Sequence, residues 1–285
     1  MKKIIIIILI TAAGSLQVWS QENINEFSIH GGVGISTLIY QLSSGDRQIG
    51  FGGDAGLGYS FIRSKEQITS TGRIYRKNWG FHTGLGIGMY NSKSKLNQQK
   101  LVTEDQCDYD GDLFDLITSF TKYVETQSVL TLNIPIMAQI QYRQFYASGG
   151  FKFAIPLNTK FSAKDVTLTN EAYYYRYKNW AKTQEFAGYG PFRNKDYKGE
   201  LDFGMSVLLA LEGGMKWRLS SILSLYTGFY FDYGLSNAYK GSPKWFIKYD
   251  QYDPEHFSTN SVLSLTADPV KLMSAGITIR IALEK

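Results

Sequence analysis

Long segments of this chain alternate apolar residues with small or polar ones, and this period of two constrains the fold more than any other feature of the sequence. Successive side chains of a β-strand point to opposite faces, so such a segment has two faces that meet different surroundings. In one segment, Trp79 and Phe81 share one face while Gly80 and His82 share the other. The chain is therefore expected to be an all-β protein.

Eight segments carry the pattern, and each has at least the roughly 9 to 11 residues that a tilted strand needs to cross a membrane. Their more polar faces are rich in glycine and charge. A soluble sandwich would turn its apolar face into a core and its charges toward water, and alternation alone fits either arrangement. The segments are residues 27–39, 51–61, 79–89, 129–140, 145–155, 201–219, 223–234 and 273–283.

The N-terminus has the order of a secretory signal peptide, since two lysines precede an apolar run and small or apolar residues lead to Ser20. The alternative is a membrane-anchor helix, which needs about 20 apolar residues. Gln17 interrupts this run. We therefore expect cleavage of residues 1–20 and a single barrel domain over residues 21–285.

Charge and cysteine content exclude several classes of protein. Loss of the two lysines before the cleavage point leaves 30 − 2 = 28 basic against 25 acidic side chains, a mature charge of +3. This near balance does not imply a nucleic-acid partner. Cys107 is the single cysteine, which excludes an internal disulfide and a multi-cysteine metal site. The 28 glycines, 20 tyrosines and 17 phenylalanines favour curved, pleated sheets.

Loop lengths distinguish a membrane barrel from a soluble sandwich. Residues 91–126, 157–200 and 236–265 form long connections, whereas residues 141–144 and 220–222 are short. Outer-membrane barrels combine long external loops with tight periplasmic turns. We therefore predict an antiparallel up-and-down transmembrane β-barrel of about eight strands with long external loops, surrounded by lipid in the outer membrane of a Gram-negative bacterium.

Three segments resemble recurring strand patterns of the PorT-like outer-membrane β-barrel family, namely Trp79–Leu85, Leu132–Ala138 and Leu223–Leu235. The likeness covers nearly all of residues 26–283. It implies the same fold and location, and it would allow a role in a secretion or envelope assembly.

Ten charged or titratable side chains share the faces predicted to line the lumen. Eight strands leave room mainly for side chains, and charges in such a space must be paired or hydrated. We predict that they form a network that fills the lumen: His30, Asp54, His82, Lys152, Asp202, Glu212, Lys216, Arg218, Asp232 and Arg280. An alternative hypothesis joins His30, Asp54 and His82 on three neighbouring strands as a catalytic or metal site.

A hydrolase would need a serine beside a histidine and an orienting group. Ser28, Ser36 and Ser60 lie on inward faces near His30, but nothing in their spacing demands that role. We therefore predict no catalytic residue and no enzymatic activity.

The first long loop contains closely spaced carboxylates at Asp108, Asp110 and Asp112. Such hard oxygen ligands suit calcium, but the glycine falls at the fourth position of an EF-hand template instead of the sixth. Calcium is the single cofactor that the sequence suggests, and a solvated acidic loop is the alternative.

The other two long loops are aromatic and basic. Clustered Tyr, Trp and Arg are typical of recognition surfaces for a protein or glycan partner, although they can also pack as a cap over the barrel mouth. The candidates are Tyr173, Tyr174, Tyr175, Arg176, Tyr177, Trp180, Trp245, Phe246, Tyr249 and Tyr252.

Two classes of function remain. The first is a structural or interaction protein that acts through its external loops. The second is a small pore or transporter for small solutes. A charged lumen filled by side chains favours the first class.

Overall fold

The protein, described from a computed structural model, consists almost entirely of β-strands. The structure describes residues 22–42, 45–68, 74–96, 99–242, 244–266 and 268–285, so the predicted signal peptide lies outside the described residues. Three short 3-10 helices occur at Glu185–Ala187, Pro254–His256 and Val262–Leu265. None of the described helices is long and apolar enough to cross a membrane.

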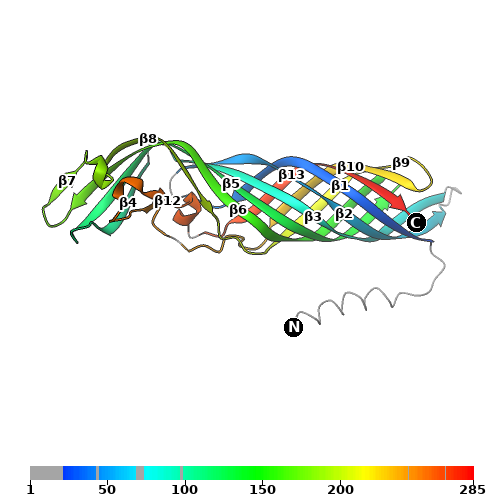
Figure 1. The fold of residues 1–285 in the computed structure, drawn as a ribbon. Coiled ribbons are helices and arrows are strands. Elements are labelled where there is room, and N and C mark those ends of the chain that lie inside the picture. Colours follow the sequence, from blue (N-terminus) through cyan, green and yellow to red (C-terminus); the bar gives the residue numbers. More distant parts are fainter. Residues whose placement is uncertain (1–21, 43–44, 69–73, 97–98, 243, 267) are drawn as a thin grey trace.

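Eight antiparallel strands form a closed ring (Figure 1). Each pairs with the ring strands that precede and follow it in the chain, and the last pairs with the first. The prediction of an all-β, antiparallel fold is confirmed. The ring strands are β1 (Glu22–Ile39), β2 (Asp46–Ile68), β3 (Ile74–Leu96), β5 (Leu113–Tyr142), β6 (Phe145–Tyr174), β9 (Ser206–Arg218), β10 (Leu223–Gly234) and β13 (Lys271–Glu284).

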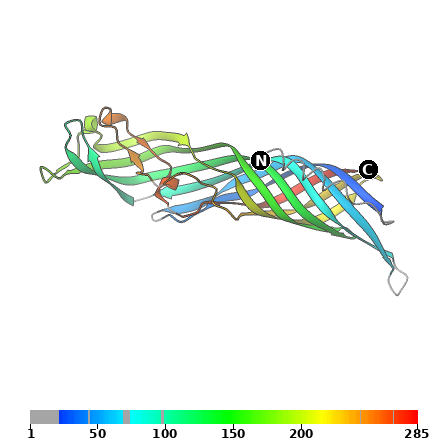
Figure 2. The ribbon, with the colours of Figure 1, turned by 90° about the horizontal axis from the view of Figure 1, so that it is seen from below.

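The prediction of about eight strands is too low for the chain as a whole, because the three predicted loops contain strands of their own. Strands β5 and β6 are each 30 residues long and continue past the ring (Figure 2). Their outer halves pair with β4 and β8. The additional strands are β4 (Gln99–Cys107), β7 (Asn179–Ala181), β8 (Gly190–Glu200), β11 (Ile247–Lys248) and β12 (Ser258–Thr259).

This second part of the molecule, which we call the extension, comprises residues 99–128, 158–200 and 244–266. Its inward face is apolar, and segment 244–266 packs against it. One cluster of buried residues joins Leu96, Phe114, Leu116, Phe120, Tyr123, Ala163, Val166, Leu168, Ala172, Tyr189, Phe192, Phe246, Ile247, Phe257 and Val262. The largest buried apolar cluster therefore lies in the extension, and a second one, which includes Leu38, Tyr90, Val129, Leu208 and Leu272, lies inside the ring next to it.

The direction in which apolar side chains point reverses along a single strand. In the ring, Ile136 and Ile140 of β5 face outward and are 48% and 57% exposed, while Gln139 faces inward and is buried. In the extension, Phe114 and Leu116 of the same strand are fully buried. Register shifts in the β5–β6 pair also change which alternate residues face inward. Counting every second residue along β5 therefore predicts the outward apolar face only within the ring. Beyond the ring, the apolar residues point inward.

Glycine is required where β1 and β13 close the ring. Gly34 and Gly276 face each other across this pair. A Cβ atom on Gly34 would lie 2.1 Å from the Ala275 carbonyl oxygen, and one on Gly276 would lie 2.1 Å from the Val33 carbonyl oxygen. Because both obstacles are backbone atoms, a larger residue would separate the strands.

Candidate functional site

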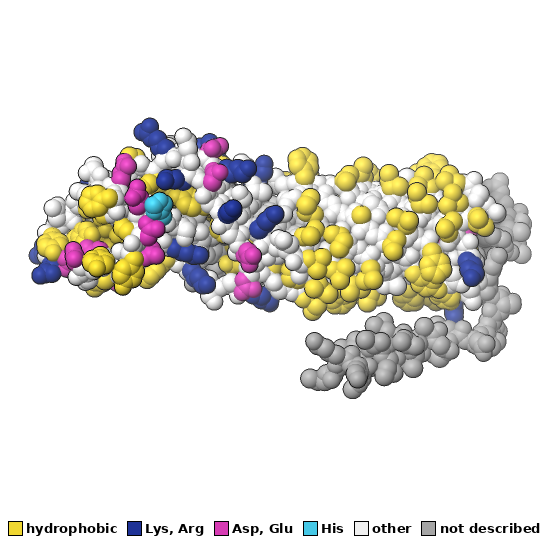
Figure 3. All heavy atoms as spheres, in the orientation of Figure 1, with side chains coloured by type: hydrophobic (Ala, Val, Ile, Leu, Met, Phe, Trp, Pro, Cys, Tyr) yellow, Lys and Arg dark blue, Asp and Glu magenta, His cyan; other side chains and the backbone are white. Residues whose placement is uncertain are grey.

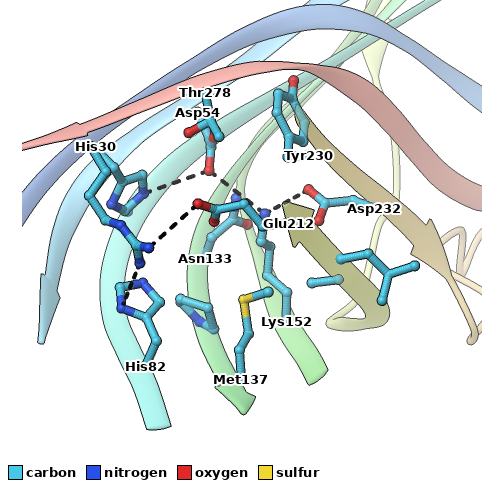
Figure 4. Close-up of a pocket in the computed structure, with 15 residues that line it drawn as sticks. His30, Asp54, His82, Asn133, Met137, Lys152, Glu212, Tyr230, Asp232 and Thr278 are labelled. Carbon is cyan, nitrogen blue, oxygen red and sulfur yellow. Dashed lines mark hydrogen bonds and ion pairs between the residues drawn. The ribbon is translucent and has the colours of Figure 1, made fainter. Parts of the chain in front are cut away.

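Lys152 of β6 lies at the centre of a charged cluster inside the ring (Figure 4). Its Nζ atom is 2.6 Å from Asp232 Oδ2 and 3.7 Å from Asp54 Oδ2. The same Asp54 oxygen is 3.7 Å from His30 Nε2. Alternate residues of β1, β2, β6 and β10 point inward, so the cluster links four strands.

Arg280 of β13 forms a second centre and is only 1% exposed. Its Nη1 atom lies 3.2 Å from His82 Nδ1, and Nη2 lies 3.2 Å from Gln139 Oε1 and 3.8 Å from Glu212 Oε1. Its Cζ atom is 4.3 Å from the centre of the Tyr226 ring, which is cation–π geometry. The guanidinium therefore has partners on several sides.

The space left between these side chains is small. The cavity bounded by His30, Asp54, Lys152 and Arg280 has a volume of about 40 Å³. A cavity needs roughly 10 to 15 Å³ to hold one water molecule, so this one has room for water but not for an ordinary solute. The lumen is filled by side chains at this level.

A third centre lies nearer the end of the ring that carries the C-terminus. Lys216 Nζ is 2.7 Å from Glu26 Oε1 and 2.8 Å from Glu284 Oε1. The Tyr226 hydroxyl donates to Glu26, whose side chain is fully buried. Sequence analysis missed Glu26 and Glu284, although each continues the inward-facing alternation of its strand. Following the pattern to the strand ends would have found both.

Two of the ten predicted lumen residues lie elsewhere. Asp202 precedes β9, which begins at Ser206, and it is exposed. Arg218 ends β9 with 58% of its side chain exposed and lies 3.6 Å from Glu284 at the rim. The alternation of apolar and polar residues begins before β9, at Phe203 and its neighbours. The sequence therefore did not show that β9 starts only at Ser206.

The predicted trio of His30, Asp54 and His82 lines one cavity, but the three side chains do not all contact one another. His30 contacts Asp54, whereas His82 Nδ1 is 2.9 Å from the Ser60 hydroxyl and 3.2 Å from Arg280. Among the residues that the structure describes, no three His, Cys, Asp or Glu side chains form a group that could hold a metal ion. The serine–histidine pair faces a guanidinium in a closed lumen, where a hydrolase would need an orienting carboxylate and a path for substrate.

The acidic turn after β4 is held by hydrogen bonds. Asp108 Oδ1 accepts the backbone N–H groups of Asp110 and Asp112 at 3.0 and 2.9 Å. The Asp112 carboxylate accepts from the Tyr177 hydroxyl at 2.6 Å and from Arg176 at 3.0 Å. These two donors lower the pKa of the Asp112 carboxyl group. Asp112 therefore connects this turn to the turn at residues 175–178, and Asp108 holds the backbone of its own turn.

Eight of the ten predicted recognition residues divide into two groups, while Tyr173 is half-buried and Arg176 is exposed and paired with Asp112. Tyr174, Phe246 and Tyr249 belong to the core of the extension or pack against it. Tyr175, Tyr177, Trp180, Trp245 and Tyr252 are between 42% and 75% exposed. The buried group therefore packs inside the extension, and the exposed group is accessible to a partner.

Glu125 fastens segment 244–266 to the sheet of the extension. This fully buried carboxylate accepts hydrogen bonds from the Tyr123 hydroxyl at 2.7 Å, the Gln127 amide at 2.8 Å and the Val262 N–H at 3.0 Å. The Ser261 hydroxyl is its fourth donor. Burial raises the pKa of Glu125. Sequence analysis missed this residue because it lies in a stretch expected to be a loop.

Replacing Lys152 by methionine should lower the free energy of unfolding by about 3 to 5 kcal/mol, because Asp232 would stay buried without its cation. Urea titration in detergent measures the change. The control K164M alters an exposed lysine of the same strand and should change stability by less than about 0.5 kcal/mol. Equal stability of K152M and the wild type would contradict the structural role of the network.

The Glu125→Gln variant should remove a pH dependence from the stability of the extension. Because the folded-state pKa of Glu125 is raised, its contribution is fully present below the unfolded pKa of about 4.5 and is lost as pH rises through the folded value. Between acidic and neutral pH, the wild type should therefore lose more stability than E125Q. Limited proteolysis of segment 244–266 across this range reports the difference. Identical pH profiles of the wild type and E125Q would contradict the role of Glu125 in holding segment 244–266.

Comparison with known proteins does not place the chain in a family: no family model matches the sequence, and no curated protein matches it. The resemblance to PorT-like barrels stays a hypothesis. The case for function rests on the geometry of the ring and the extension.

Proposed function

We propose that this protein is an integral outer-membrane β-barrel with a closed lumen, and that it acts as an interaction protein through the extension outside the membrane. The observation that carries the proposal is the reversed polarity of the ring, which has charged groups inside and an uncharged, largely apolar surface outside. A water-soluble protein rarely exposes an apolar patch larger than a few hundred Å².

The outer surface of the ring has no charged side chain over the strand segments that bear the apolar pattern. Phe51, Phe229 and Ile29 are 80%, 72% and 66% exposed. On the face that Figure 3 shows, apolar side chains are spread over the ring, whereas charged side chains gather over the extension. The uncharged outward-facing positions span residues 27–39, 49–61, 79–91, 130–142, 145–157, 207–217, 223–235 and 273–283. Outer-membrane barrels carry such a band, about 25 Å tall.

Aromatic side chains at one end of the band support a membrane boundary there. Tyr142 faces Phe145 across the β5–β6 turn, and Phe27 faces Tyr59 across β1 and β2. Aromatic girdles mark both interfaces of outer-membrane barrels. The short β5–β6 and β9–β10 connections lie at this end, as periplasmic turns would. The extension then projects from the cell, in a protein exported by the predicted signal peptide.

The closed lumen favours an interaction protein over the pore alternative. Lys152, Lys216 and Arg280 each pair with residues of other ring strands. Conduction would require several of these contacts to break, and each would leave a charge without its partner.

The extension has the properties of a recognition module. Its sheet continues the strands of the ring, and the mostly irregular segment 244–266 is held against that sheet by the apolar cluster and by Glu125. Trp180, Trp245 and Tyr252 are exposed on it, and Trp and Tyr contribute much of the binding energy in protein interfaces.

An arginine on the outer surface of the ring tests the membrane assignment. Ile277 faces outward in the middle of the band, so I277R should weaken folding into phosphatidylcholine vesicles by about 2 to 4 kcal/mol. The control T169R changes an outward-facing position of β6 in the extension and should fold like the wild type. Heat-dependent gel mobility after urea titration measures folding. Unimpaired insertion of I277R would oppose the proposal.

Planar-bilayer recording tests the closed lumen. The wild type should show no steady single-channel steps, because its lumen is blocked at the level of Lys152 and Arg280. The variant K152A/D232A removes one ion pair and should stay closed as well, because the contacts of Arg280 and Lys216 remain. Steady wild-type conductance would favour the pore.

A further inference from the structure

Four lysines surround a cavity on the side of the extension nearest the ring. Lys198, Lys240, Lys244 and Lys248 line a space of about 340 Å³. Among the described residues, none of the four forms an ion pair. Their positive charges are therefore available to a ligand.

The wall of this cavity is held by the fold. The Lys240 N–H donates to the Asp202 carbonyl oxygen at 2.7 Å, and the Lys244 N–H donates to the Ser264 carbonyl oxygen at 3.1 Å. Ser261, which also lines the cavity, is bound to the buried Glu125. Backbone and side-chain bonds thus position the lysine-bearing segments.

A buried hydroxyl group provides a second, independent observation. Ser264 lines the cavity and is only 4% exposed. Its Oγ atom has no hydrogen-bond partner within the described part of the chain. Buried polar atoms are nearly always hydrogen-bonded, so this hydroxyl can bond a water molecule or a polar group of a ligand that enters the cavity.

A second cavity of about 730 Å³ adjoins the first. Lys244, Lys248, Asn260 and Ser264 line both cavities. Trp245, which is 57% exposed, lines only the second. The two cavities therefore offer an aromatic face, an amide and several cations within one continuous region.

We propose that this region binds an acidic oligosaccharide, an inference that rests on the proposed role of the extension in recognition. Lysines would pair with the carboxylates of the sugar acids, and the Trp245 ring would contact a sugar face. Glu200 and Asp202 also line the lysine cavity. They can accept hydrogen bonds from sugar hydroxyl groups, which a simple anion such as phosphate lacks.

Binding of a labelled galacturonic acid hexasaccharide to the full-length protein in lipid nanodiscs tests this inference. The protein should bind this probe, should bind neutral maltohexaose much more weakly, and should lose affinity as salt rises. Replacing two lysines in K244Q/K248Q should raise the Kd by about 10-fold or more, because charge-assisted contacts are lost. W245A should also weaken binding, whereas K178Q, at an exposed lysine of the distant tip, should not.

Absence of binding, or equal binding by the wild type and K244Q/K248Q, would overturn the inference. Displacement of the probe by an equal concentration of inorganic phosphate would show a simple anion site and would also overturn it. Heat-dependent gel mobility confirms that each variant has folded in lipid. A protein that inserts normally but fails to bind the probe contradicts this inference alone, whereas unimpaired insertion of I277R contradicts the proposed membrane function.

Discussion

Pairing of buried charges inside the ring is the constraint on which the rest of the structure depends. An ion removed from water costs several kcal/mol unless a partner and hydrogen bonds compensate. Each lumen cation has such partners: Lys152 has Asp232, Arg280 has Glu212 and the Tyr226 ring, and Lys216 has Glu26. Because the partners come from different strands, the contacts hold only when the ring is closed. Closing the ring brings the charges together, and their pairing in turn stabilises the closed ring. The paired side chains leave little space for a solute.

The same strands meet opposite requirements at their two ends. The ring segment of β5 directs Ile136 and Ile140 outward, whereas the segment in the extension buries Phe114 and Leu116. This inversion is what a chain needs if its ring lies in lipid and its extension lies in water, as we propose. The extension gains an apolar core because segment 244–266 returns to cover it, and Glu125 fixes that segment.

In the function that we propose, this division separates anchorage from recognition. A lumen closed by ion pairs makes the ring a rigid base. The paired strands of the extension then hold Trp245 and the surrounding lysines on segments with defined positions. Ordered segments lose less conformational entropy on binding than free loops, which suits a surface that must recognise an extended ligand. The proposed glycan site uses side chains from segments far apart in the sequence, and packing against the extension holds them together.

The sequence by itself determined the β-class, the eight ring segments and the direction of most ring side chains, because alternation is a local property of a strand. It therefore identified eight of the lumen residues, including Lys152 and Arg280. Only the tertiary structure decided which groups pair, since Lys152 and Asp232 are 80 residues apart and Tyr226 and Glu26 are 200 apart. It also decided that the predicted loops are strands, because the polarity of their two faces inverts outside the ring. The face to which a side chain points depends on its neighbours in the chain. Which charges pair depends on how the ring closes, and which side chains are buried in the extension depends on the segments that return to cover it.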